Sequence, residues 1–192
     1  KYSKYSVAAT EYCQMTDDKN SGVYDLIAKE KKGTNGTSIK YGVAMANTIV
    51  DDLTIMNANE WDWWTACSYG TYTDGLIYLD EDNHENLDFS KRYYCLGNFS
   101  KFIKEGAVRV ACSSGVKNVR SVAFVNEDNT VVTVYVNNND KKAYTTIDCE
   151  GDYAVYTTDR DNDIAKTDFG KAKKVKVSLP ASSVVTVVYE AK

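Results

Sequence analysis

Glu11 stands where a reacting carboxylate is often found. It directly follows YSVAAT, a small apolar run that is typical of a buried strand. In parallel α/β structures the reacting groups lie at the carboxyl ends of strands, because loops rather than packing decide the residues there. A solvated loop residue or a helix-cap partner is the alternative interpretation of a glutamate at such a position.

The three tryptophans of the chain lie within four positions, in the run NEWDWWTACS. In a strand, Trp61 and Trp63 point to one side, and Asp62 and Trp64 point to the other. A flat indole suits the C–H face of a sugar ring, but large aromatic side chains also fill cores. Composition alone does not separate a sugar-binding surface from good packing.

Two acidic runs raise the question of a metal site. In DRDNDIAKTDFG, Ile164 stands where an EF-hand loop needs glycine, and Gly170 stands where it needs glutamate. LDEDNHEN offers no closing ligand, and His84 is the only histidine. The five cysteines form no C-x-x-C pair. We therefore expect no metal, and we interpret both runs as solvated surface.

The totals exclude several kinds of partner. A net charge of −4 without a basic stripe argues against nucleic acid. No apolar run approaches the roughly 18 residues that span a bilayer, so we expect no membrane partner. Cys67, Cys95 and Cys112 lie in apolar contexts that indicate buried core thiols.

The hydrophobic period changes near residue 105. Before it, apolar residues at helical spacing predict helices over 38–57 and 88–104, with a shorter helix over 23–31. YSVAAT and WDWWTACS are apolar on both faces, as strands buried between two layers are. The order strand, helix, strand, helix predicts a parallel arrangement.

After residue 105 the period falls to two, and polar turns separate short apolar segments. About seven such strands predict an antiparallel β-sandwich. The predicted strands cover residues 107–112, 118–125, 130–136, 143–148, 153–158, 173–179 and 183–189. The lysine-rich run KAKKVKV is typical of a protected sheet edge.

Four segments, in this order and spacing, resemble the C-terminal half of the glycoside hydrolases of family thirty. They are ATEYCQM, NEWDWWTACSYGTYTDGLIYLD, YYCLGNFSKFIKEGAVRV and LPASSVVTVVYE. The resemblance implies an α/β plus all-β fold: the last two βα units of a (β/α)8 barrel in residues 1–105, then an antiparallel β-sandwich in residues 106–192. It also implies hydrolysis of β-linked glycans with retention of configuration. The second segment is most similar to the β-1,6-galactanase branch.

The resemblance implies roles for individual residues. Glu11 matches the nucleophile at the end of the seventh barrel strand, and Trp63 matches the tryptophan that lines the sugar subsite from the eighth. The further candidates for the wall of the substrate site are Trp61, Tyr12, Tyr69 and Tyr72. No cofactor is needed, because two carboxyl groups suffice for this chemistry.

The general acid/base of the family lies on the fourth barrel strand, upstream of Lys1. A complete barrel takes roughly 250 residues, so we expect the chain to be a fragment that is inactive alone. Its expected partners are an oligo- or polysaccharide and either the upstream barrel half or a second copy. The family also implies a secreted, extracellular protein. The alternative function is a non-catalytic carbohydrate-binding or structural β-sandwich module.

Overall fold

The computed structural model describes residues 6–13, 38–69, 74–80, 82–83 and 85–190. The chain forms two compact units, Lys1–Tyr93 and Tyr94–Lys192. The division falls inside helix α3 (Lys91–Ser100), whereas the change of hydrophobic period lies near residue 105. A domain boundary at 105/106 stays a prediction.

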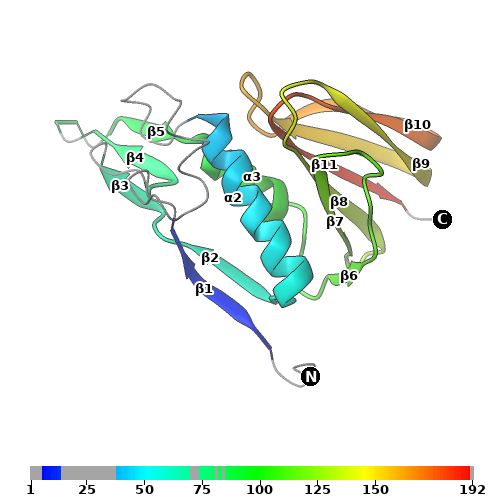
Figure 1. Cartoon of the computed structure of the whole chain (residues 1–192), viewed down its shortest axis with the longest axis horizontal. Coiled ribbons are helices and arrows are strands. Elements are labelled where there is room, and N and C mark those ends of the chain that lie inside the picture. Colours follow the sequence, from blue (N-terminus) through cyan, green and yellow to red (C-terminus); the bar gives the residue numbers. More distant parts are fainter. Residues whose placement is uncertain (1–5, 14–37, 70–73, 81, 84, 191–192) are drawn as a thin grey trace. The chain divides into compact units, whose positions relative to one another are not determined.

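The first unit is built on two parallel strands. Strands β1 (Ala8–Tyr12) and β2 (Glu60–Trp63) pair in parallel, so the predicted parallel arrangement is confirmed. The chain returns between them through helix α2 (Ile39–Asp51), which continues into one π-helical turn, η1 (Asp52–Met56) (Figure 1).

Helix α2 follows from its sequence. Ser38 caps its amino end, where the hydroxyl accepts a hydrogen bond from the backbone N–H of Lys40 at 3.3 Å. Met45 and Ile49 lie on the buried stripe, and Asn57 ends the helical segment in the left-handed conformation, with φ of 59°. These features confirm the helix predicted over 38–57.

One face of the two-stranded sheet is open to solvent. Ala8 and Thr10 on β1 are exposed, as is Glu60 on β2. The prediction that both strands are buried on both faces is therefore wrong in this chain. The reason is that this sheet contains only two strands among the described residues, so no further strands curl round to cover the face.

A second, small sheet follows β2 in the first unit, and the sequence pattern did not predict it. Its three-residue strands are β3 (Cys67–Tyr69), β4 (Ile77–Leu79) and β5 (Leu87–Phe89). Strands β3 and β4 are parallel, and β4 and β5 are antiparallel. Because β5 occupies the start of the helix predicted over 88–104, α3 begins only at Lys91. The helix predicted over 23–31 lies outside the described residues.

The second unit contains a six-stranded antiparallel sheet in the order β10-β9-β11-β8-β7-β6. Valine and threonine dominate its central strands, as expected for residues that pack well on a pleated surface. The strands are β6 (Val108–Val110), β7 (Val119–Val125), β8 (Thr130–Asn137), β9 (Ala143–Thr158), β10 (Ala165–Leu179) and β11 (Ser183–Glu190).

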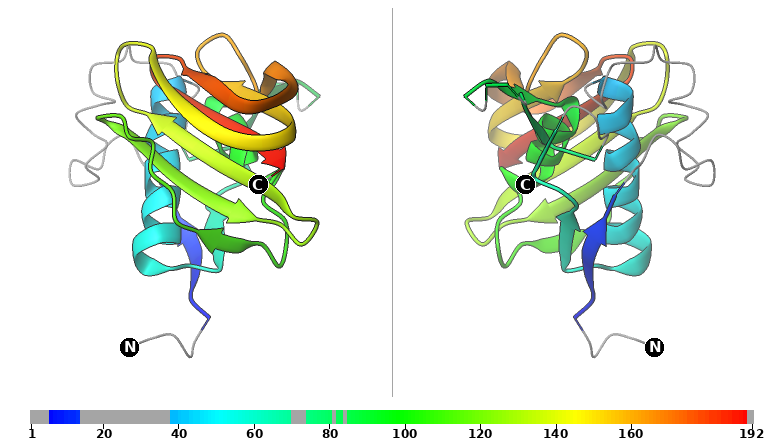
Figure 2. Two further views of the ribbon diagram at one scale, coloured as in Figure 1. Left: turned by 90° about the vertical axis from the view of Figure 1, so that its right-hand side faces the viewer. Right: turned by 90° about the vertical axis from the view of Figure 1, so that its left-hand side faces the viewer.

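Strand β9 is one strand of 16 residues, so the predicted turn at EGD is wrong. Gly151, with φ of 116°, keeps its pairing with Ala172, and a glycine there lets the strand bend without ending. The amino half of β9 and the carboxyl half of β10 pair with each other as a ribbon, and both strands curl in Figure 2.

The core of the second unit lies between the ribbon and the sheet. Ile147 and Val177 on the ribbon belong to one buried cluster with Val185 and Val187 on β11. Two layers enclosing one apolar core is the arrangement that the alternating sequence pattern predicts.

Strand β10 is an edge strand, because within the described part of the chain it pairs with β9 alone. Lys171, Lys173 and Lys174 on it are exposed. Charged side chains discourage a second chain from pairing with such an edge, so the prediction of a lysine-protected edge is confirmed.

None of the cysteines that the structure describes is in a disulfide bond. Cys95 is buried, as predicted, and Cys112 is half-buried. Cys67 is exposed, so its prediction as a core thiol is wrong; it lies on the solvent side of β3. In the described ranges, no helix is long and apolar enough to cross a lipid bilayer.

Candidate active site

Strand register places Glu11 on the open face of the two-stranded sheet. Ala9 pairs with Trp61 and Tyr12 pairs with Trp63, with an irregularity between the two pairs. Two residues of β1, Thr10 and Glu11, therefore oppose one residue of β2, which is the arrangement of a β-bulge. Glu11 is exposed at the carboxyl end of β1.

The opposite face of this sheet holds three aromatic rings. The Tyr12 ring centroid lies 5.8 Å from that of Trp61 and 6.0 Å from that of Trp63. The two indoles stack with centroids 6.2 Å apart. The predicted alternation is thus confirmed for Trp61 and Trp63, which share one side.

Hydrogen bonds hold these rings against the helix and the following loop. Trp61 Nε1 donates to the carboxylate of Asp52 at 2.8 Å, and Thr48 Oγ1 donates to the Tyr12 hydroxyl at 3.3 Å. Trp63 Nε1 donates to the backbone carbonyl of Asp74 at 2.6 Å. These contacts use the polar atoms of both indoles inside the unit.

Trp64 lies on the other side. It directly follows β2, its backbone N–H donates to the Tyr12 carbonyl at 3.0 Å, and 54% of its surface is exposed. Strand alternation puts it on the side of Asp62, which is the residue that Thr10 and Glu11 oppose. The exposed indole at the carboxyl end of β2 is therefore Trp64. The sequence placed it opposite Trp61 and Trp63, but the structure shows which of the two sides is exposed.

The other two predicted wall residues lie beyond β2. Tyr69 ends β3 and is 42% exposed. Tyr72 lies outside the described residues.

Sequence reasoning missed Arg92, which is completely buried. Its Nη2 donates to the Tyr78 hydroxyl at 2.7 Å and to the Gly75 carbonyl at 3.0 Å. The guanidinium carbon lies 5.0 Å from the Trp63 ring centroid and 5.5 Å from that of Tyr41, within cation–π range. Arg92 thus ties α3 to the small sheet and to the aromatic face of β2.

Burial changes the ionisation of this cluster. It lowers the pKa of Arg92 and raises the pKa of Tyr78, because removal from water penalises each charged form. Burial also raises the pKa of the Cys13 thiol, and Asp74 adds to this shift. A neutral Tyr78 hydroxyl is the state that accepts a hydrogen bond from the guanidinium and remains a donor itself.

We predict that Arg92→Ala destabilises the first unit by about 2–4 kcal/mol, because it opens a cavity and leaves buried acceptors without a donor. All three tryptophans lie in this unit, so tryptophan fluorescence during urea unfolding reports on it selectively. Lys40→Ala, an exposed cation of the same unit, is the matched control. Equal midpoints for the two variants would show that Arg92 is dispensable.

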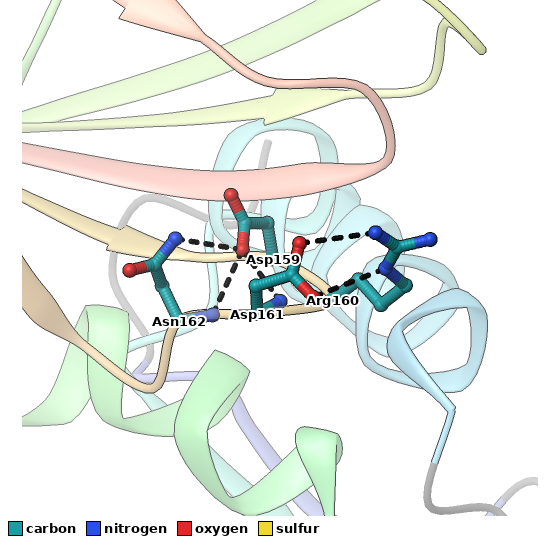
Figure 3. Close-up of polar contacts among 4 residues, drawn as sticks. All are labelled: Asp159, Arg160, Asp161 and Asn162. Carbon is teal, nitrogen blue, oxygen red and sulfur yellow. Dashed lines mark hydrogen bonds and ion pairs between the residues drawn. The ribbon is translucent and has the colours of Figure 1, made fainter.

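Each acidic run contains a turn held by its first aspartate, and residues 165–170 of the first run belong to β10. Asp159 is buried, so the interpretation of the first run as solvated surface is wrong at this residue. Asp159 Oδ1 accepts hydrogen bonds from the backbone N–H groups of Asp161 and Asn162 and from Asn162 Nδ2, each at 2.9 Å (Figure 3). Asp80 Oδ1 accepts from the backbone N–H groups of Asp82 and Asn83 in the same way. The described residues contain no group of three or more side chains that could hold a metal ion.

Two family models match the chain in succession. Residues 5–78 match the O-glycosyl hydrolase family 30 model, and residues 106–187 match the glycosyl hydrolase family 30 β-sandwich domain. The second match agrees with the two-layered core of the second unit.

Solved structures share this fold. A family 30 endoxylanase from Clostridium papyrosolvens C71 is 21% identical, with a TM-score of 0.74 over 99% of this chain and 44% of that one. A family 30 subfamily 8 xylanase from Clostridium acetobutylicum is 24% identical, with a TM-score of 0.75 over 98% and 43%. A conserved exported protein from Bacteroides fragilis is 26% identical, with a TM-score of 0.77 over 95% and 38%.

The chain therefore spans less than half the length of each of these structures. The two model matches follow each other along the chain in the order of the two compact units. The chain belongs to glycoside hydrolase family 30, of which it carries a C-terminal portion.

Proposed function

We propose that this chain is the C-terminal portion of a retaining glycoside hydrolase and that Glu11 is its nucleophile. The observation that carries the proposal is the position of Glu11, exposed at the carboxyl end of β1 and opposite Asp62 on the open face. In this proposal, β1, α2 and β2 are part of the last two βα units of a (β/α)8 barrel, and the open face is the side that the completed barrel encloses.

Retention of configuration needs a second carboxyl group about 5 to 5.5 Å from the first. In the first step the Glu11 carboxylate attacks the anomeric carbon, the bond to the leaving oxygen breaks, and the second group donates a proton to that oxygen. In the second step water displaces Glu11 from the sugar, and the second group takes up the proton. We assign the second group to the upstream half of the barrel, and the reaction uses no cofactor.

We propose Trp64, rather than Trp63, as the indole that lies against the sugar. Trp64 is exposed and lies on the face of Glu11, whereas the Trp63 indole donates to the Asp74 carbonyl and packs on Arg92. In this role Trp63, Trp61 and Tyr12 support the strand from the helix side, and Tyr69 remains a candidate for the wall.

Trp64→Ala is expected to lower kcat/KM of the completed enzyme by about 10- to 150-fold, from the roughly 1.5–3 kcal/mol that an aromatic side chain gains on burial. Trp63→Ala is expected instead to lower the stability of the first unit by about 2–4 kcal/mol. Initial rates together with urea unfolding separate the two effects. If Trp63→Ala lowered kcat/KM and Trp64→Ala lowered only the stability, Trp63 would be the indole that lies against the sugar.

We propose a β-linked polysaccharide as substrate, with β-1,6-galactan as the first to test because of the sequence resemblance. Secretion is part of the proposal, and the Bacteroides fragilis protein described as exported supports it.

Mixing tests the function. The chain alone, the upstream half alone and their mixture are assayed on aryl β-glycosides and on β-1,6-galactan. The proposal predicts activity only in the mixture. Glycan binding without activity in the mixture, unchanged by Glu11→Gln, would instead support a non-catalytic module.

A further inference from the structure

The small sheet presents an exposed apolar face. Register places six side chains on one side of β3, β4 and β5, since Cys67 pairs with Ile77, which pairs with Phe89, and alternate residues follow. This apolar face consists of Cys67, Tyr69, Ile77, Leu79, Leu87 and Phe89. Tyr69, Leu87 and Phe89 are 42%, 49% and 39% exposed, and the ring of Tyr93 extends the face, 5.0 Å from Phe89.

The other side of the same sheet is anchored. Tyr78 is buried and receives the hydrogen bond from Arg92. Ser68 is buried and donates to the carboxylate of Asp74 at 2.7 Å. The apolar face is therefore the solvent side of a fixed platform.

A pocket of about 280 Å3 borders this face. Leu79 and Leu87 belong to both. The pocket is also lined by Tyr78, Asp80, Asn86 and Asp88, of which Tyr78 and Asp88 lie on the other side of the sheet, so the pocket reaches round its end. Apolar surface beside a few hydrogen-bonding groups is the usual composition of a small-ligand site. Carboxylate and amide groups can bind sugar hydroxyls while the aromatic rings cover the C–H faces.

The surroundings are strongly acidic. The segment from Trp61 to Ser90 contains seven aspartates and glutamates and no lysine or arginine, and Lys91 and the buried Arg92 follow it directly, so the acidic groups remain in excess. These negative charges repel a polyanion that approaches the face, and the repulsion is strongest at low salt. An uncharged ligand meets no such barrier.

The size of the face selects a chain of sugars over a protein partner. Three strands about 4.8 Å apart, each about 10 Å long, present roughly 140 Å2. A stable protein interface buries about 800 Å2 on each partner. The face alone therefore supplies only part of the surface that a stable interface with a second copy would bury.

We propose that the apolar face and its pocket form an accessory subsite that binds an uncharged glycan chain and rejects a carboxylated one. Strand β3 begins three residues after Trp64, at most about 11 Å of chain away, and the small sheet lies beyond the carboxyl ends of β1 and β2 (Figure 1). In (β/α)8 enzymes the loops at this end build the substrate site. The inference rests on the proposed function, since it places this subsite on the same substrate.

Affinity electrophoresis of the full chain tests the subsite, with β-1,6-galactan, unsubstituted β-xylan, glucuronoxylan and polygalacturonate in the gels. We expect retardation by at least one uncharged polymer and none by polygalacturonate. Tyr69→Ala and Phe89→Ala should each weaken binding about two- to tenfold. Phe169→Ala, which removes an aromatic side chain that is 68% exposed on the second unit, should leave it unchanged. Circular dichroism verifies that each variant is folded.

A charge reversal provides a second arm. Asp82→Lys with Glu85→Lys changes two exposed carboxylates and should allow polygalacturonate to bind. The inference would be overturned if charged and uncharged polymers retarded the protein without substitutions equally. It would also be overturned if the Tyr69→Ala and Phe89→Ala variants bound the polymers as strongly as that protein. A change in oligomeric state of those variants, seen by gel filtration, would assign the face to a second copy instead.

The outcomes are distinguishable from those for the proposed function. If mixing with the upstream half gives activity that needs Glu11 while the Tyr69 and Phe89 variants bind normally, only the subsite is wrong. If these variants lose binding while no mixture is active, the subsite stands and the hydrolase proposal fails.

Discussion

Glu11→Gln is expected to lower kcat of the completed enzyme by about 10^4- to 10^6-fold, the range found when a catalytic nucleophile is removed. Glutamine keeps the shape of the side chain but cannot form the glycosyl ester. Because Glu11 is exposed, the substitution should leave the unfolding midpoint of the first unit unchanged. Single-turnover rates on an aryl β-glycoside, measured with the chain mixed with its upstream half, give the comparison.

Glu60→Gln is the matched control. Glu60 is exposed on the same sheet but at the amino end of β2. The Glu60→Gln variant should therefore retain near-normal activity. Equal losses for the two variants would mean that the acidity of the face, rather than one nucleophile, is needed.

Asn98→Ala is expected to destabilise the second unit by about 2–4 kcal/mol, because it opens a cavity and removes the buried hydrogen bonds between the Asn98 side chain and Thr158 and Thr186. Asn98 is completely buried. Its Nδ2 donates to Thr158 Oγ1 at 2.5 Å, and its backbone and side-chain oxygens accept from Thr186 Oγ1 at 2.7 and 3.1 Å. One side chain thus joins α3 to β9 and β11.

Far-UV circular dichroism during guanidinium unfolding follows this loss, with Asn138→Ala at an exposed position as the control. A double-mutant cycle with Thr186→Val isolates the pair. Asn98→Ala should lower the free energy of unfolding by less in the Thr186→Val background than in the protein without that substitution. Strictly additive effects would show that the Asn98 contacts act independently.

Sequence patterns predicted the elements that carry a clear period. The 3.6-residue period of 38–57 predicted helix α2. The two-residue period after residue 105 predicted the strands of the six-stranded sheet. These patterns failed where one residue changes the path of the chain. Gly151 is indistinguishable in sequence from a turn glycine, although here it lets β9 continue. The three-residue strands of the small sheet are too short to show any period.

For the candidate site, the sequence predicted the carboxyl-end position of Glu11 and the sharing of one side by Trp61 and Trp63. It did not show which side faces the helix, because both sides of β2 carry indoles and the choice depends on the register with β1. The burial of Arg92 could not be predicted from the sequence for a similar reason. Its burial depends on Tyr41, Trp63 and Tyr78, which are distant in sequence, whereas a single arginine in a helix ordinarily lies in solvent.

Trapping of the covalent intermediate tests the role of Glu11 most directly. An activated 2-deoxy-2-fluoro-β-glycoside forms the glycosyl ester but releases it slowly, so the sugar stays on the nucleophile. After incubation with the chain and its upstream half, the tryptic peptide 5–19 should gain the mass of the fluorosugar, with fragmentation placing it on Glu11. Active material whose label lies on any other carboxylate would contradict the assignment.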